Sequence, residues 1–187
     1  FPDIALEFNT SALYLQQTLS FYLLAFACMT LVYGPLSDTF GRRVVILGAV
    51  AVYIGCSIGC AVATSEHWLL AMRIGQGLSA SGGIVVGRAI IRDAFAGVQA
   101  QRVMAQMMLM FALAPAVAPI VGGWLHEAFG WRSVFVFLAL LGLGTWVWTA
   151  LSLPETLPAI ARQSIHPRAV AAAYGRALRS SAFLLLV

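Results

Sequence analysis

Long apolar runs separated by short polar loops set the strongest limit on what this chain can fold into. Five runs are long enough to cross a bilayer, at 12–36, 44–64, 68–91, 103–125 and 133–152. About 20 apolar residues span a hydrocarbon core of roughly 30 Å, and a helix satisfies its own backbone hydrogen bonds there. The sequence therefore predicts an all-α membrane protein with five transmembrane helices.

The composition is that of a membrane protein. Of 187 residues, 61% are hydrophobic and 10% are charged, whereas a soluble domain carries about 25% charged residues. All eleven basic residues are arginines, and most fall in the short loops, where basic residues orient a chain in a bilayer. The net charge of +4 therefore does not indicate a nucleic-acid partner.

The cysteines and histidines do not form a pattern that binds metal. Cys28, Cys56 and Cys60 lie inside apolar runs with no nearby histidine or acidic residue, and the histidines lie in loops without ligand spacing. Such cysteines are typical of small buried apolar side chains. We predict no metal, no cofactor and no enzymatic activity.

The distribution of arginines among the loops predicts how the chain is oriented. Arginines follow the first, third and fifth apolar runs: Arg42, Arg43, Arg92, Arg102, Arg162, Arg168, Arg176 and Arg179. These three loops are therefore predicted to be cytoplasmic, and the other two, which hold Glu66 and Glu127, to face the opposite side. Segment 154–180 is predicted to be a cytoplasmic linker with a short surface helix over 168–179, and 181–187 to begin a second bundle.

A ten-residue phrase occurs twice. The segment GPLSDTFGRR at 34–43 is similar to the segment GWLHEAFGWR at 123–132. Five of the ten positions are identical, Asp38 is matched by Glu127, and the offset is 89 at every position. Because three crossings separate the copies, they are predicted to face opposite sides of the membrane, as in inverted-topology repeats of transporters. The repeat also predicts a helix just before the chain, so that 1–153 is a six-helix bundle whose first helix is largely missing.

Several motifs resemble the major facilitator superfamily. The phrase at 34–43 resembles its loop motif between helices 2 and 3, RIGQG at 73–77 its helix-4 motif, and APIVGG at 118–123 its helix-5 antiporter motif, although Thr39 and Ala118 depart from these patterns. The branch of bicyclomycin and chloramphenicol resistance transporters (Bcr/CflA type) is suggested by three further segments: RAIIRD at 88–93, FGWRSVF at 129–135 and LPETL at 153–157. The resemblance implies the amino-terminal half of a twelve-helix transporter, from the end of helix 1 to the start of helix 7.

The resemblance also implies a function. It is proton-coupled efflux, a drug:proton antiport by alternating access across the bacterial inner membrane. The implied partners are a small apolar or cationic drug-like substrate, protons, the lipid bilayer and a carboxy-terminal six-helix half. Two alternatives stay open: an importer or facilitator of a small metabolite on the same fold, and a non-transporting membrane scaffold.

The loop motif predicts a charge network that gates the cytoplasmic side. Its residues are Gly34, Asp38, Gly41, Arg42, Arg43, Arg92 and Asp93. The glycines allow a tight turn and a close backbone approach, and Asp38 can pair with Arg42 or with Arg92. Making and breaking such pairs would supply the two states that alternating access needs. The alternative is that Arg42 and Arg43 only orient the hairpin.

Arg73 is a charged residue inside an apolar run. It lies about 7.5 Å along the helix axis from Trp68, near enough to a membrane edge to snorkel. Helical spacing instead places it with Gln76 on a stripe of small residues, which faces a neighbouring helix or a polar path. By resemblance, Arg73, supported by Gln76, would tune the protonation of an acidic residue in helix 1 of the family.

The apolar run at 103–125 contains two prolines on one helix face. Pro115 and Pro119, followed by Gly122 and Gly123, predict a bend that packs against the partner bundle and seals one side. The alternative is that proline is simply common in transmembrane helices.

Aromatic and methionine side chains are the candidate substrate contacts, because they adapt to varied apolar ligands and aromatic rings also hold cations. If the family's cavity lies between helices 1, 2, 4 and 5, the candidates are Tyr22, Phe26, Thr30, Tyr33, Met107, Met108 and Phe111. Ordinary helix packing explains most of them equally well.

Overall fold

The computed structural model describes residues 4, 7–8, 10–158, 160 and 162, and this part of the chain is all-helical. Its long helices are α2 (Ala12–Phe40), α3 (Arg42–Ala61), α4 (Glu66–Ala94), α5 (Gly97–Phe129) and α6 (Arg132–Ser152). All five are long and apolar enough to cross a membrane. The predicted fold class is confirmed. The predicted surface helix at 168–179 and the start of a second bundle at 181–187 lie outside the described residues.

Most of the helices extend past the predicted apolar runs, whereas α3 ends at Ala61, before the end of its run. The largest difference is in α5, which has 33 residues and is therefore about 50 Å long at 1.5 Å per residue. A helix of that length exceeds a hydrocarbon core of roughly 30 Å, so its polar first turns lie beyond the apolar run. Hydrogen bonds to side chains mark two helix starts, where Ser11 accepts from the backbone N–H of Tyr14 and Ser65 from that of Trp68.

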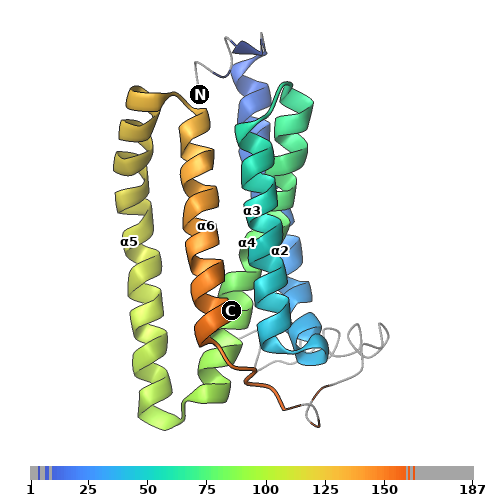
Figure 1. Ribbon diagram of the computed structural model, residues 1–187, viewed down its shortest axis with the longest axis vertical. Coiled ribbons are helices and arrows are strands. Elements are labelled where there is room, and N and C mark those ends of the chain that lie inside the picture. Colours follow the sequence, from blue (N-terminus) through green and yellow to red (C-terminus); the bar gives the residue numbers. More distant parts are fainter. Residues whose placement is uncertain (1–3, 5–6, 9, 159, 161, 163–187) are drawn as a thin grey trace, which may run out of the picture.

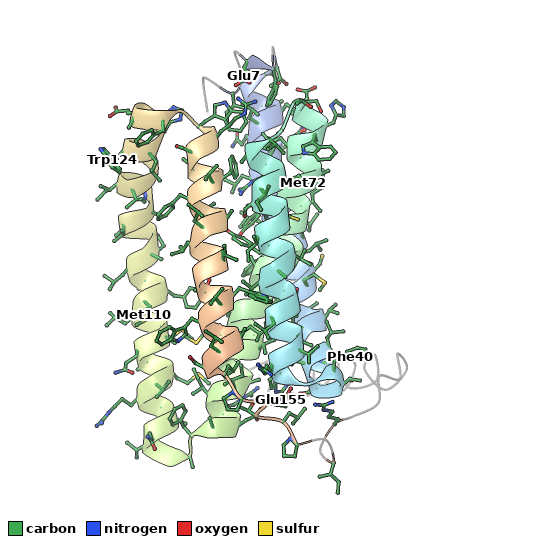
Figure 2. All side chains as sticks on the ribbon, viewed as in Figure 1. Glu7, Phe40, Met72, Met110, Trp124 and Glu155 are labelled. Carbon is green, nitrogen blue, oxygen red and sulfur yellow. The ribbon has the colours of Figure 1, made fainter. Side chains whose placement is uncertain are left out.

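The two copies of the repeated phrase form the same turn. Gly41 ends α2 with φ +97° and Gly130 ends α5 with φ +80°, a backbone conformation that glycine adopts without strain. The N–H of Gly41 donates to the carbonyl of Ser37, and that of Gly130 donates to His126. Figure 2 shows Phe40 at one end of the bundle and Trp124 at the other. The turns therefore lie at opposite ends, as the inverted repeat predicts.

The helices pack unequally. α4 packs closely on α2 and α3, and α3 packs on α6, whereas α5 packs lightly on α4 and α6. Figure 1 shows α5 at the edge of the bundle beside α6. Glycines permit the closest approaches: a Cβ at Gly77 would collide with the Tyr22 carbonyl, and one at Gly142 would lie 2.9 Å from Ile54. No residue of α5, all of which is described, is buried.

Candidate functional site

Arg42 is the centre of a charge cluster at the end of the bundle where α2 meets α3. Its Nη1 lies 2.5 Å from Asp38 Oδ1, and its Nε donates to Asp93 Oδ2 at 3.0 Å. Nη1 also donates to Ser37 Oγ at 2.6 Å. The side chain of Arg42 is 9% exposed. One buried guanidinium therefore joins the ends of α2, α3 and α4.

Glu155, just after α6, completes this cluster. Its Oε1 accepts from the backbone N–H of Arg42 at 2.9 Å and from that of Leu157 at 3.1 Å, while Oε2 lies 3.8 Å from Nη2 of Arg162. A carboxylate at the N-terminus of α3 is favourable, because the first N–H groups of a helix have no helical partner. A Cβ at Gly41 would collide with this carboxylate. Glu155 was not predicted as a site residue, although it lies in the LPETL motif at 153–157.

The other predicted members of the network have different surroundings. Nη2 of Arg43 donates to the carbonyl of Ala150 at 2.7 Å, near the end of α6. Asp38 pairs with Arg42 rather than with Arg92, which is exposed and forms no ion pair with the described residues. Apart from its chain neighbours and the backbone of its own helix, no described atom lies within 4 Å of a Cβ placed on Gly34. The close approach expected at both glycines is therefore found only at Gly41, because Gly34 lies within α2 rather than at the turn.

Arg73 belongs to a polar layer inside the bundle. Its Nη1 donates to Gln76 Oε1 at 2.9 Å, and its guanidinium carbon lies 4.6 Å from the centre of the Tyr22 ring. Gln76 Nε2 donates to Ser57 Oγ on α3 at 2.8 Å. Gln76 and Ser57 are both 0% exposed. The structure therefore brings Arg73 and Gln76 together as predicted, and adds Ser57, which no sequence motif had indicated.

A cavity of about 470 Å³ lies beside Arg73. Its far wall comes from α5, through Pro119, Gly122, Gly123 and His126. Three of the four residues predicted to form the bend therefore face the same space as Arg73, whereas Pro115 does not line it. The two prolines do not interrupt the helix: α5 is continuous through Pro115 and Pro119.

A smaller cavity of about 280 Å³ is lined by Tyr22, Tyr53, Ala80 and Gly83, together with residues of α6. Of the predicted substrate contacts, Tyr22 lines one of these two cavities. Phe26 stacks on the Tyr22 ring at 6.5 Å between centroids.

The remaining substrate candidates are elsewhere. Tyr33 is buried in the core with Val45 and Val86, and the hydroxyl of Thr30 donates to its own helix, at the carbonyl of Phe26. The candidates on α5 line neither of these two cavities: Met107, Met108 and Phe111.

A second cluster closes the opposite end of the bundle. Glu7 Oε2 accepts from Trp131 Nε1 at 2.8 Å and from Arg132 Nη1 at 2.9 Å, and Arg132 Nη2 donates to the carbonyl of Ala63. These donors hold the pKa of the Glu7 carboxyl below its ordinary value. Glu7 was not predicted as a site residue, because nothing in the sequence indicates that it meets Trp131 and Arg132.

Five apolar helices, paired charges at both ends and an arginine facing an internal cavity define a multi-pass membrane protein of the transporter class. The chain belongs to the Major Facilitator Superfamily, whose family model matches residues 1–187. Members of this family are transporters rather than enzymes.

Named relatives refine this comparison. The chain is 39% identical over 140 residues to the chloramphenicol resistance protein of Pseudomonas aeruginosa, covering 74% of the chain and 33% of that protein. It is 33% identical over 156 residues to the bicyclomycin resistance protein homolog of Haemophilus influenzae, covering 83% and 39%. The crystal structure of the human organic anion transporter MFSD10 matches with a TM-score of 0.69 and 25% identity, covering 82% of the chain and 35% of that structure. The chain thus spans about two fifths or less of these proteins.

Proposed function

We propose that the chain forms the amino-terminal part of a drug:proton antiporter in the bacterial inner membrane. In this proposal the transporter exports small apolar or cationic drug-like compounds by alternating access, together with a carboxy-terminal six-helix half. The names of the relatives support a drug substrate, because they are resistance proteins for chloramphenicol and bicyclomycin. The chain covers 39% or less of each of these two, so the activity belongs to a longer protein.

The main support for the proposal is the environment of the Arg73 side chain. A charged side chain in a bilayer costs about 2.5 to 3.5 kcal/mol at the centre by insertion scales and less toward the edge, so the cost for Arg73, in the first half of α4, is below this figure. Arg73 nevertheless lines the larger cavity, and none of the described acidic residues forms an ion pair with it. An acidic residue on a helix that packs into this cavity would pair with Arg73. Protonation of that acid would break the pair, which couples proton binding to a change of conformation.

The Arg42 cluster supports alternating access in the same proposal. It ties α2, α3 and α4 to Glu155 at one end of the bundle. This end carries Arg42, Arg43 and Arg92, and the positive-inside rule assigns an end rich in arginine to the cytoplasm. The cluster would keep this end rigid, so that the bundle moves as one body against its partner half.

Efflux measurements on the full-length transporter test the proposal. We expect cells that express it to exclude chloramphenicol or a cationic dye, and a protonophore to abolish the exclusion. Arg73→Ala should abolish transport, whereas Arg92→Ala, which removes an exposed arginine, should retain it. Uptake in place of exclusion would favour the metabolite importer, and exclusion that survives the protonophore would contradict proton coupling.

A further inference from the structure

A buried chain of hydrogen bonds connects the backbone of α3 to Arg73. It runs from the Tyr53 carbonyl through the Ser57 hydroxyl and the Gln76 amide to the Arg73 guanidinium, with links of 2.8, 2.8 and 2.9 Å. We propose that Ser57 is a positioning residue that fixes Arg73 through Gln76. The inference rests on the coupling role proposed for Arg73 and adds a residue from a different helix to it.

The donors and acceptors in this chain allow one arrangement. Arginine only donates, so Gln76 must turn its carbonyl oxygen toward Arg73 and its amide nitrogen toward Ser57. The Ser57 oxygen accepts from that nitrogen, and its proton goes to the Tyr53 carbonyl. Loss of the Ser57 hydroxyl would leave a buried amide without its acceptor, and the Gln76 side chain would rotate to find another.

Close helix packing keeps the links short. A Cβ at Gly75 would lie 2.5 Å from Cys56 Sγ, and one at Gly59 would lie 2.5 Å from Met72 Sδ. The facing surfaces of α3 and α4 are therefore in contact on either side of the Ser57–Gln76 link. The ring of Tyr22 on α2 holds the guanidinium from another side.

Few titratable groups face Arg73. They are Tyr22 on α2, Tyr53 and Cys60 on α3, and His126, which lines the same cavity from α5. No described aspartate or glutamate hydrogen-bonds to Arg73. A change in pH dependence near neutrality therefore has two sources, the acid that Arg73 is proposed to pair with and His126. Measurements in a His126→Asn background separate the two.

Drug-stimulated proton release by the full-length transporter, measured from pH 5 to pH 9, tests the inference. In Ser57→Ala, Arg73 is held less firmly and lowers the pKa of its acid less, so we expect the midpoint to rise by roughly half a pH unit. Transport at pH 7 should fall about threefold to tenfold. Ser57→Thr keeps the hydroxyl and should restore both. Ser81→Ala is the matched control, because Ser81 is also 0% exposed but its hydroxyl has no partner within the described residues.

The outcomes distinguish the inference from the proposed function. An unchanged midpoint in Ser57→Ala, together with an inactive Arg73→Ala, overturns the positioning role and leaves proton coupling standing. An active Arg73→Ala overturns both. If Ser57→Ala does not fold, Gln76→Leu breaks the same chain and should show the same rise, in the wild-type and the His126→Asn background alike.

Discussion

Arg42 combines several interactions that are individually weak. A buried arginine is stable only when its donors are paired, and Arg42 meets two carboxylates and a serine hydroxyl. Both carboxylates are partly exposed, so each pair is screened more than a fully buried one. The fork of donors on the guanidinium, which lysine lacks, allows one side chain to reach Asp38 and Asp93 together.

Arg42→Lys is expected to destabilise the protein although it keeps the charge. An ammonium group cannot reach Asp38 and Asp93 in the same geometry, and we expect a loss of about 1 to 2 kcal/mol in unfolding free energy. Thermal unfolding in detergent measures the change. Arg92→Lys at the exposed neighbouring arginine is the control, and an equal effect in both variants would argue against the cluster.

Gly41→Ala and Gly34→Ala should have opposite effects. Gly41 has φ +97° and faces the Glu155 carboxylate, so alanine there is strained by about 1 to 2 kcal/mol before the clash is counted. Gly34 lies within α2 with open space at its Cβ, and alanine there should stabilise the helix by up to about 1 kcal/mol. Unfolding midpoints of the two variants provide the comparison, and a stable Gly41→Ala would contradict the close contact.

α3 and α6 form a reciprocally braced antiparallel pair. Arg43 at the start of α3 donates to the carbonyl of Ala150 at the end of α6, and Arg132 at the start of α6 donates to the carbonyl of Ala63, just after α3. Carbonyls at helix C-termini lack helical partners and carry partial negative charge, so a cation there is favourable. Arg43 and Arg132 are equivalent positions of the repeat, which explains why the brace occurs at both ends.

Glu7 makes the brace at the Arg132 end sensitive to acid. Because Trp131 and Arg132 donate to its carboxylate, the pKa of Glu7 lies below its ordinary value of 4.5. Its charged form is favoured in the folded state, so its contribution to stability is present above that pH and is lost as pH falls through the lowered pKa. We expect Glu7→Gln to unfold at a lower temperature than wild type at pH 7.

The difference between Glu7→Gln and wild type should shrink as the pH falls below the ordinary value of 4.5 and disappear once it is below the lowered pKa of Glu7. Glu127→Gln, at the same end of the bundle, should follow the wild-type curve throughout. A constant difference between Glu7→Gln and wild type from pH 3 to pH 7 would show that the charge of Glu7 does not contribute.

The bundle as a whole has a tightly packed part and an open part. α4 lies against α2 and α3, with glycines at the contacts, whereas α5 is unburied and faces the cavity beside Arg73. Exposed leucine, valine and aromatic side chains along the helices suit a lipid environment or contact with another helical segment. The inverted repeat relates the two ends, each with a glycine turn and a paired arginine.

Labelling of the two repeat turns tests the topology of the whole molecule. Phe40 and Phe129 are equivalent positions and are 52% and 69% exposed. In a background without native cysteines, a membrane-impermeant maleimide should label Phe129→Cys in intact cells. It should label Phe40→Cys only in inverted vesicles. Labelling of both from one side would contradict the inverted repeat.

The apolar runs, the glycine turns and the loop arginines were sufficient to predict the five helices and their order, and the resemblance of the motifs at 34–43, 73–77 and 118–123 indicated the family. Hydrophobic length defines a membrane span, and glycine and charge mark its ends, so this information is local along the chain. The pairing of Arg73 with Gln76 was also predictable, because the two residues are three apart on one helix.

The partners on different helices came from the packed structure. Asp93 rather than Arg92 reaches the cluster, Ser57 holds Gln76, and Tyr33 is buried in the core instead of facing a cavity. In a soluble protein an apolar stripe shows which face of a helix is buried, but in a membrane the lipid-facing surface is apolar too. The rotation of each helix, and with it every contact between helices, is therefore set by close packing at glycines and by pairing of buried polar groups, which are properties of the assembled bundle.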